Sequence, residues 1–208
     1  MPEGKRLSAA ERRSQLVSVG RTVFAERGYD ATSVEEIAER AGVSKPIVYE
    51  HFGGKEGLYA VIVDREMELV ITSVSEAISE GTPRDRVAAA TLAFLTYVKE
   101  HPDGFAVLSR DAPGNLGMAS LLAEVGERVG QIFAAEFKRA GYDPKAAPIY
   151  AQALIGMVTF VGQWWTENRR RSIEDVASHV TALAWMGLRH LPKKPERVTR
   201  TRRSPTTT

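Results

Sequence analysis

The sequence of 208 residues contains no cysteine. This absence excludes disulfide scaffolds, thiolate zinc sites, iron–sulfur clusters and thiol nucleophiles, and it fits a reducing compartment. The first 18 residues also lack an apolar segment, because charged side chains such as Lys5, Arg6 and Glu11 interrupt them. A secretory signal peptide needs such a segment. We therefore expect a cytoplasmic protein.

Enzyme signatures are missing as well. The sequence has no Gly-x-Ser-x-Gly elbow, no dinucleotide-binding fingerprint and no complete P-loop. Residues 53–55, Gly-Gly-Lys, match only the end of a P-loop and lack the Ser or Thr that follows its lysine. The histidines do not have the spacing of metal ligands: His51, His101, His179 and His190. We expect no enzyme activity, no bound metal and no cofactor.

One uncharged stretch, residues 146–166, is long enough to raise the question of a membrane span. Its composition argues against one, because Gln152, Thr159 and Gln163 interrupt it and no second span accompanies it. We expect a buried core helix or an interface helix here, and no membrane partner.

The net charge of +2 is unevenly distributed along the chain. Residues 1–55 carry a net +1, residues 56–188 a net −5 and residues 189–208 a net +6. The basic end mixes Pro, Thr and Arg without apolar periodicity, which is typical of a disordered segment. It serves either as a solubilising tail or as a non-specific phosphate binder.

Apolar residues recur at intervals of three and four over most of the chain, and strand signals are weak, so we predict an all-α protein of about nine helices. Candidate N-caps are Ser8, Ser33, Ser44, Thr82 and Ser172. The expected domains are a helix-turn-helix domain over residues 1–54, a helical ligand-binding and dimerisation domain over 55–191, and a basic tail over 192–208.

Two short predicted helices, about 33–41 and 45–52, are joined by a tight turn that contains Gly42. This is the helix-turn-helix arrangement, in which the second helix enters the major groove of DNA. With Val48 and Phe52 facing the core, the outer surface keeps Lys45, Pro46, Ile47, Tyr49, Glu50 and His51. An exposed isoleucine suits a thymine methyl group. Glu50 either accepts a hydrogen bond from a cytosine amino group or is solvated.

The same region carries a family resemblance. The residues that carry it fall at the spacing of a known family signature: Thr32, Ile37-Ala38, Ala41-Gly42-Val43-Ser44, Tyr49, His51-Phe52 and Lys55-Glu56. Residues 12–62 resemble the N-terminal signature of the TetR family of bacterial transcriptional regulators. The resemblance implies a homodimer that binds a double-stranded, palindromic DNA operator and responds to a small-molecule effector. The predicted DNA-binding residues are Thr32, Ser33, Ser44, Lys45, Pro46, Ile47, Tyr49, His51 and Lys55.

Large apolar side chains gather after residue 90, where they line either a plain core or an apolar ligand pocket. We predict a pocket lined by Phe94, Tyr97, Phe105, Leu108, Arg110, Met118, Leu121, Leu122, Phe133, Phe137, Phe160, Gln163 and Trp164. Further polar candidates are Asn115, Gln152 and Thr159. An acyl chain, as free acid or thioester, fits this lining, with Arg110 meeting its carboxylate or phosphate. A bulky apolar drug is the alternative effector.

The dimer is predicted to form through the last two helices. Small residues allow close helix approach, and apolar ones supply the surface: Ala151, Ala153, Gly156 and Gly162, with Ile149, Ile155, Val158, Ala177, Val180, Ala184 and Leu188. We interpret the chain as a repressor released from DNA by an apolar effector. A transcriptional activator on the same scaffold, or a multidrug-sensing repressor of an efflux gene, remains the alternative.

Overall fold

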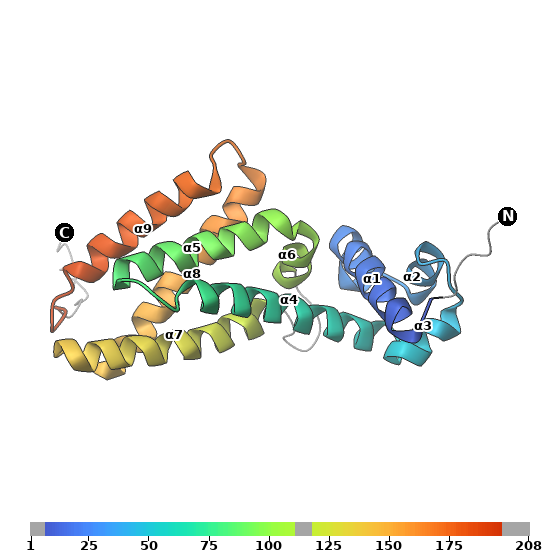
Figure 1. Ribbon diagram of the computed structural model, residues 1–208, viewed down its shortest axis with the longest axis horizontal. Helices are drawn as coiled ribbons and strands as arrows, with labels where there is room; N and C mark the ends of the chain where they lie inside the picture. The colour runs from blue at the N-terminus through green and yellow to red at the C-terminus, as the bar shows by residue number, and fades with distance from the viewer. Residues whose placement is uncertain (1–6, 111–117, 197–208) are drawn as a thin grey trace, which may run out of the picture.

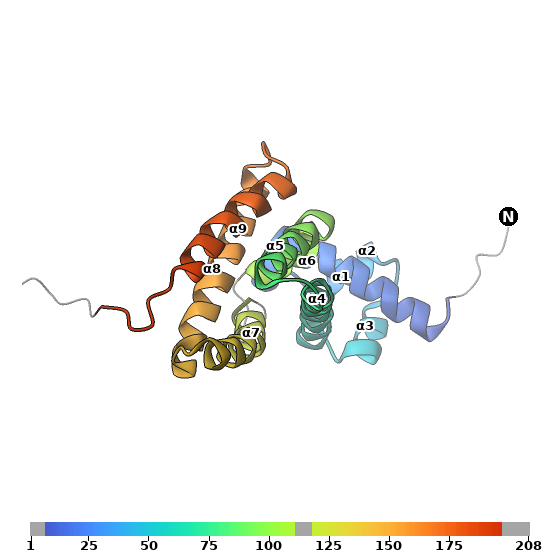
Figure 2. The ribbon, with the colours of Figure 1, turned by 60° about the vertical axis from the view of Figure 1, so that its left-hand side comes forward.

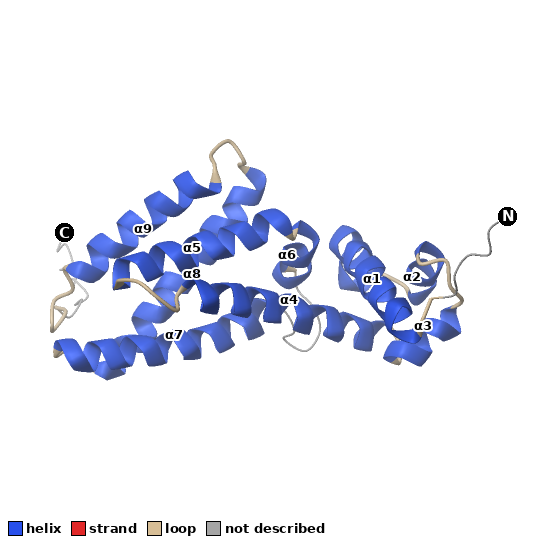
Figure 3. Cartoon of the chain, in the orientation of Figure 1, coloured by secondary structure: helices blue, strands red, loops and turns tan. Residues whose placement is uncertain are grey.

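The computed structural model describes residues 7–110 and 118–196. Asn115 and most of the basic tail lie outside these ranges, as does the side chain of Met118. The described residues form helices and loops without strands (Figure 3). The helices are α1 (Ala9–Ala31), α2 (Val34–Arg40), α3 (Lys45–Phe52), α4 (Lys55–Ala77), α5 (Pro83–Glu100), α6 (Pro102–Ser109), α7 (Met118–Ala140), the short 3-10 helix η2 (Pro144–Ala146), α8 (Ala147–Glu167) and α9 (Ile173–Arg189).

The all-α prediction is thus confirmed, and the two short helices predicted at about 33–41 and 45–52 correspond to α2 and α3 within one residue at each end. Helix α1 includes a break at Gly28, where φ is 78°, so its regular part ends there. Helix α4 runs without a break over 23 residues and ends at Ala77.

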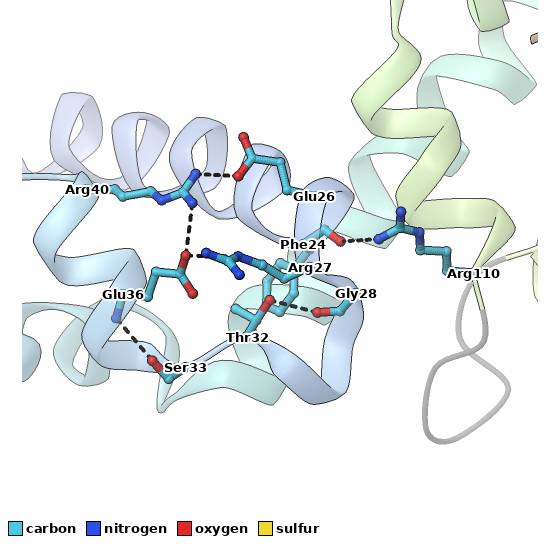
Figure 4. Close-up of polar contacts among 9 residues, drawn as sticks. All are labelled: Phe24, Glu26, Arg27, Gly28, Thr32, Ser33, Glu36, Arg40 and Arg110. Carbon is cyan, nitrogen blue, oxygen red and sulfur yellow. Dashed lines mark hydrogen bonds and ion pairs between the residues drawn. The ribbon is translucent and has the colours of Figure 1, made fainter.

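The predicted N-caps form at four of five sites. Ser8 and Thr82 make complete capping boxes, and Ser172 accepts a hydrogen bond from the Asp175 N–H at 3.1 Å. Ser33 caps α2 by accepting from the Glu36 N–H at 3.1 Å (Figure 4). The prediction that Ser44 caps α3 is wrong, because its side chain makes no cap hydrogen bond.

The helices fall into two groups joined by α4 (Figure 1). Helices α1 to α3 gather at one end, and α4 runs from that end into the second group, where α5, α7, α8 and α9 lie. Helix α7 packs on α8, and α5 packs on both α4 and α9. Helix α6 lies between the groups and contacts α1, α4 and α5. The N-terminal group therefore reaches the rest of the chain through α4 and α6.

The uncharged helix is more exposed than expected. Within the described residues, Pro144–Glu167 is the stretch long and apolar enough to cross a membrane, and only 17% of its most apolar window is buried. The prediction of a buried core helix is therefore wrong, and an interface helix remains. Its large exposed side chains are Ile149, Phe160 and Trp164, which are 69%, 73% and 50% exposed.

A buried carboxylate joins the two groups of helices. Glu66 on α4 is 2% exposed and accepts hydrogen bonds from Arg21 Nη1 on α1 and from the Tyr97 hydroxyl on α5, both at 2.9 Å. Burial, followed by the charge and hydrogen bond of Glu66, raises the pKa of Tyr97 above its ordinary value, so this phenol remains a donor. Gly104 on α6 leaves room for the carboxylate: a Cβ there would lie 2.0 Å from Glu66 Oε2.

Gly104→Ala should destabilise the protein by about 1–3 kcal/mol, because the added methyl group overpacks a site in which the Glu66 carboxylate is held on two sides. Urea denaturation measures this loss. Gly130→Ala on α7 is the matched control, because its Cβ would meet Pro148 at an ordinary 3.9 Å and alanine favours helix. Equal stability of the two variants would contradict the proposed packing role of Gly104.

Candidate functional site

Helix α3 has one side packed in the core and a polar side exposed to solvent. Val48 is fully buried, and Phe52 lies under the Arg13 guanidinium, 4.8 Å from its ring centroid. Lys45, Pro46, Tyr49 and Glu50 are exposed, as predicted for a helix that enters a DNA groove. Ile47 differs from its prediction: it is only half-exposed and packs partly against the core. Its β-branched side chain is thus shared between the core and the surface.

Lys45 already has a partner in the free protein. Its ammonium forms an ion pair with Glu35 on α2, and it lies 5.7 Å from the ring centroid of Tyr49. The hydrogen bond with Glu35 raises the pKa of Lys45 and lowers that of Glu35. Both side chains are exposed, so this ion pair is weak enough to be exchanged for a phosphate or a base.

Thr32 is placed differently from its prediction. It is 3% exposed, and its hydroxyl donates to the Gly28 carbonyl at 2.7 Å (Figure 4), so its side chain cannot reach a phosphate. Ser33 remains exposed, and its capping oxygen still has a hydroxyl proton to donate. The carboxylate of Glu36 does not complete a capping box, because Arg40 at 2.9 Å and Arg27 at 3.5 Å bind it instead.

Lys55 opens α4 beside α3. Its ammonium donates to the Tyr29 carbonyl at 3.0 Å and lies 4.3 Å from the Tyr29 ring centroid. Two of its N–H donors remain, next to the free N–H groups at the start of α4. His51 is half-buried beside Phe52, and Ser44 is exposed. Together, Ser33, Ser44, Lys45, Tyr49 and Lys55 supply donors suited to a nucleic-acid backbone.

The second candidate site is a cavity of about 440 Å³ among α4, α5, α7, α8 and α9. Its wall is mainly apolar, as in sites that bind apolar small molecules. Five of the predicted residues line it: Phe94, Leu121, Leu122, Phe133 and Phe137. Thr159 lines it too.

The other predicted lining residues lie elsewhere. Phe105 and Leu108 are buried in the core, and Tyr97 binds Glu66. Arg110 does not line the cavity; its Nη1 lies 3.5 Å from the carbonyl of Phe24 in the second half of α1 (Figure 4). Gln152 packs against Gly126 on α7. Phe160, Gln163 and Trp164 are exposed on α8 and are not part of the lining.

The cavity also contains residues that the sequence analysis missed. Helix α8 turns Leu154, Ile155 and Val158 toward it, and α9 contributes Trp185 and Leu188. Ile155, Val158 and Leu188 were assigned to the dimer surface, and that assignment is wrong. Likewise Ala151, Gly162, Ala177, Val180 and Ala184 are buried within the single chain. The direction of the apolar stripe on α8 could not be read from spacing, because the helix is apolar nearly all round.

Arg86 was missed for a different reason. It lines the cavity although it is charged, and it stands four and eight residues before Ala90 and Phe94 on the same face of α5. A charge on an otherwise apolar helical stripe was the signal that could have found it.

The fold and these two sites define a helix-turn-helix DNA-binding regulator with a separate small-molecule cavity. Residues 16–62 match the family of bacterial regulatory proteins called the tetR family, and residues 83–187 match a tetracyclin repressor-like C-terminal domain. The chain belongs to the TetR family of bacterial transcriptional regulators.

Two relatives align over most of both chains. The HTH-type transcriptional activator FasR of Mycolicibacterium smegmatis is 31% identical over 91% of this chain and 88% of that protein. A TetR-like regulator from Rhodococcus sp. RHA1 is 27% identical, with a TM-score of 0.74 over 89% of this chain and all of that structure. The fold is also shared with AibR, whose crystal structure is in complex with isovaleryl coenzyme A and operator DNA. AibR is 20% identical to this chain, with a TM-score of 0.69 over 83% of this chain and 97% of that one.

Tyr49→Ala should weaken binding to all DNA sequences to a similar degree, because an exposed side chain at the edge of α3 is suited to a phosphate contact. Ile47→Ala should instead cost affinity mainly at one base pair, by about 1 kcal/mol. Gel shifts with an operator and its single-base variants measure both effects. Arg128→Ala on α7, which removes a distant exposed cation, is the control. Unchanged operator affinity in Tyr49→Ala at moderate salt would show that the DNA surface lies elsewhere.

Proposed function

We propose that this protein is an effector-controlled regulator of transcription, which binds a palindromic operator as a homodimer and leaves it when an apolar molecule fills the cavity. The observation that carries this proposal is the cavity itself, an apolar space of about 440 Å³ built partly from α4. Helix α4 follows α3 after the turn at Gly53 and Gly54 and packs against it, so the same helix borders the cavity and supports the DNA-reading helix.

The outward face of α8 and α9 supports the homodimer. Ile149, Phe160 and Trp164 on α8 and Leu183 and Met186 on α9 are all at least half exposed. Both helices lie on the same flank of the molecule, away from α1 to α3 (Figure 2). Soluble monomers seldom expose so many large apolar side chains together. A second copy covers this face by two-fold symmetry, which sets two α3 helices against successive major grooves, about 34–36 Å or a multiple apart.

The buried carboxylate of Glu66 connects α5, which lines the cavity, with α1 at the DNA-reading end. Phe94 lines the cavity, and Tyr97, almost one turn further along α5, donates to Glu66. Glu66 in turn holds Arg21 of α1. A ligand that moves α5 therefore acts on α1 through two hydrogen bonds. Its effect on DNA affinity is bounded by the difference between its affinities for the two arrangements.

The proposed effector is an amphiphile with an acyl chain rather than a bulky drug. The cavity wall is almost wholly aliphatic or aromatic, and burial contributes about 0.8 kcal/mol per methylene. We propose repression as the mode of action. Activation is the second candidate, favoured by FasR, which is named an activator and aligns over 91% of this chain. In either mode the protein acts on the chromosome, which places it in the bacterial cytoplasm.

Phe160→Glu should convert the dimer into a monomer of 22.9 kDa, because a carboxylate at the centre of the apolar face would lose its water on association. Light scattering at micromolar concentration measures the mass. Leu69→Glu places the same charge on an exposed leucine of α4, outside this face, and should leave the mass unchanged. A wild-type mass of 22.9 kDa would overturn the proposed dimer.

Saturated fatty acids and their thioesters of increasing length should raise the melting temperature in step with chain length, and the same ligands should change operator affinity. Thermal shift and gel shift measure the two effects together. Stabilisation by flat cationic dyes without any dependence on chain length would replace the acyl effector with a drug. Ligand binding that leaves DNA affinity unchanged would refute the regulatory proposal.

A further inference from the structure

Among the lining residues that the structure describes, the charged ones lie at one end of the cavity. Arg86, Glu136 and Arg189 line it at the start of α5, near the end of α7 and at the end of α9. These three helix ends lie together at the pole of the molecule farthest from α1 to α3 (Figure 1). Around Phe94 and Leu121, the lining residues within 7–110 and 119–196 are uncharged. The cavity is thus polarised along its length.

Within the described residues, the two arginines at that end, Arg86 and Arg189, have no carboxylate as an ion-pair partner. The Nε of Arg86 is buried and has no hydrogen-bond partner, and within the described ranges no carboxylate lies at ion-pair distance from Arg86 or Arg189. Glu136 is bound to Arg139 at 3.0 Å, which neutralises it. The nearby Asp85 is engaged as well, since its carboxylate accepts from the N–H and the hydroxyl of Thr82.

A guanidinium whose N–H group is buried without a partner carries an unmet desolvation cost. A ligand that supplies an anionic oxygen at this point removes that cost, and Arg can bind a carboxylate or phosphate with two parallel hydrogen bonds. From Arg86 to Phe94 the helix rises about 12 Å, which leaves space for an alkyl chain behind the bound head group.

We infer that the effector is an anionic amphiphile, whose head group binds Arg86 at the pole distal to the DNA-binding helices and whose chain points along α5 toward Phe94. This inference rests on the proposed function and adds the charge and the direction of the ligand to it. The anionic oxygen belongs either to the carboxylate of a free acid or to a phosphate of a coenzyme A thioester. Both present the same chemistry to the guanidinium.

The test compares ten-carbon ligands that differ in their head groups: decanoate, decanol, decyltrimethylammonium and decanoyl coenzyme A. Calorimetric titration of the full-length wild type should show anionic ligands binding about tenfold to a hundredfold more tightly than decanol, with the cationic ligand weakest. Arg86→Gln should remove this preference while decanol affinity changes less than about twofold. Arg86→Lys should restore part of it.

Arg84→Gln is the matched control, because Arg84 is an exposed arginine two residues away on the same helix and is not part of the lining. It should keep the full preference for anions. If Arg86→Gln weakens the binding of decanoate alone, the carboxylate of the free acid binds Arg86. If it weakens the binding of decanoyl coenzyme A alone, a phosphate of the thioester binds Arg86. Either result supports the inference.

Three results would overturn the inference. The first is equal affinity of the wild type for decanoate, decanoyl coenzyme A and decanol, and the second is tighter binding of decyltrimethylammonium than of the anionic ligands. The third is an equal loss of affinity for every ligand in Arg86→Gln. These leave the proposed function intact, because an apolar ligand still binds. The wild-type comparison stands even if a variant does not fold. If no alkyl ligand of any length binds, the proposed function fails and the inference fails with it.

Discussion

Burial of the Glu66 carboxylate is the constraint on which the arrangement of this molecule depends. A carboxylate that is 2% exposed is costly unless its oxygens are hydrogen-bonded and its charge is paired. Arg21 supplies the charge from α1, and Tyr97 supplies a hydrogen bond from α5. The end that carries α1 to α3 therefore cannot turn freely against α5 without leaving a buried charge unpaired. Gly104 completes the site by letting α6 approach.

Other polar contacts act at the same junction. The Thr22 hydroxyl donates to Asp103 on α6 at 2.8 Å, and the Tyr59 hydroxyl donates to the Val107 carbonyl at 3.1 Å. Arg110, at the end of α6, lies 3.5 Å from the Phe24 carbonyl. These hydrogen bonds are set within a continuous apolar core that includes Phe24, Ile62 and Leu108. Apolar packing tolerates a range of geometries, whereas these polar contacts are satisfied in only one. The hydrogen bonds therefore fix how α6 sits against α1 and α4.

Helix α8 shows how one apolar segment can serve two surfaces. Ile155 and Val158 face the cavity, while Ile149, Phe160 and Trp164 face outward. Both sets are apolar, so the cavity and the outward face share a wall only one helix thick. Any change in cavity shape therefore reaches the outward face directly, and the two proposed properties of this end, ligand binding and dimerisation, are mechanically linked.

Much of the fold was determined locally and could be predicted from sequence. The caps at Ser8, Ser33, Thr82 and Ser172 form with neighbours three residues away, so their residue types suffice to define helix starts. The helix-turn-helix was equally readable, because Val48 and the Gly42 turn act within a few residues of each other. The same locality explains why the exposure of Lys45 and Tyr49 on α3 was predicted correctly, whereas His51 is half-buried.

What the sequence could not determine was the direction in which apolar helices face. Periodicity gives the stripe on each helix, but only packing against α7 and α5 decided that Phe160 and Trp164 point outward while Val158 points into the cavity. The tertiary structure also decided the partners of long polar side chains: Thr32 binds Gly28, and Arg110 lies beside Phe24 rather than in the cavity. Arg86 lines the cavity for the same reason, since its surroundings come from helices far apart in the chain.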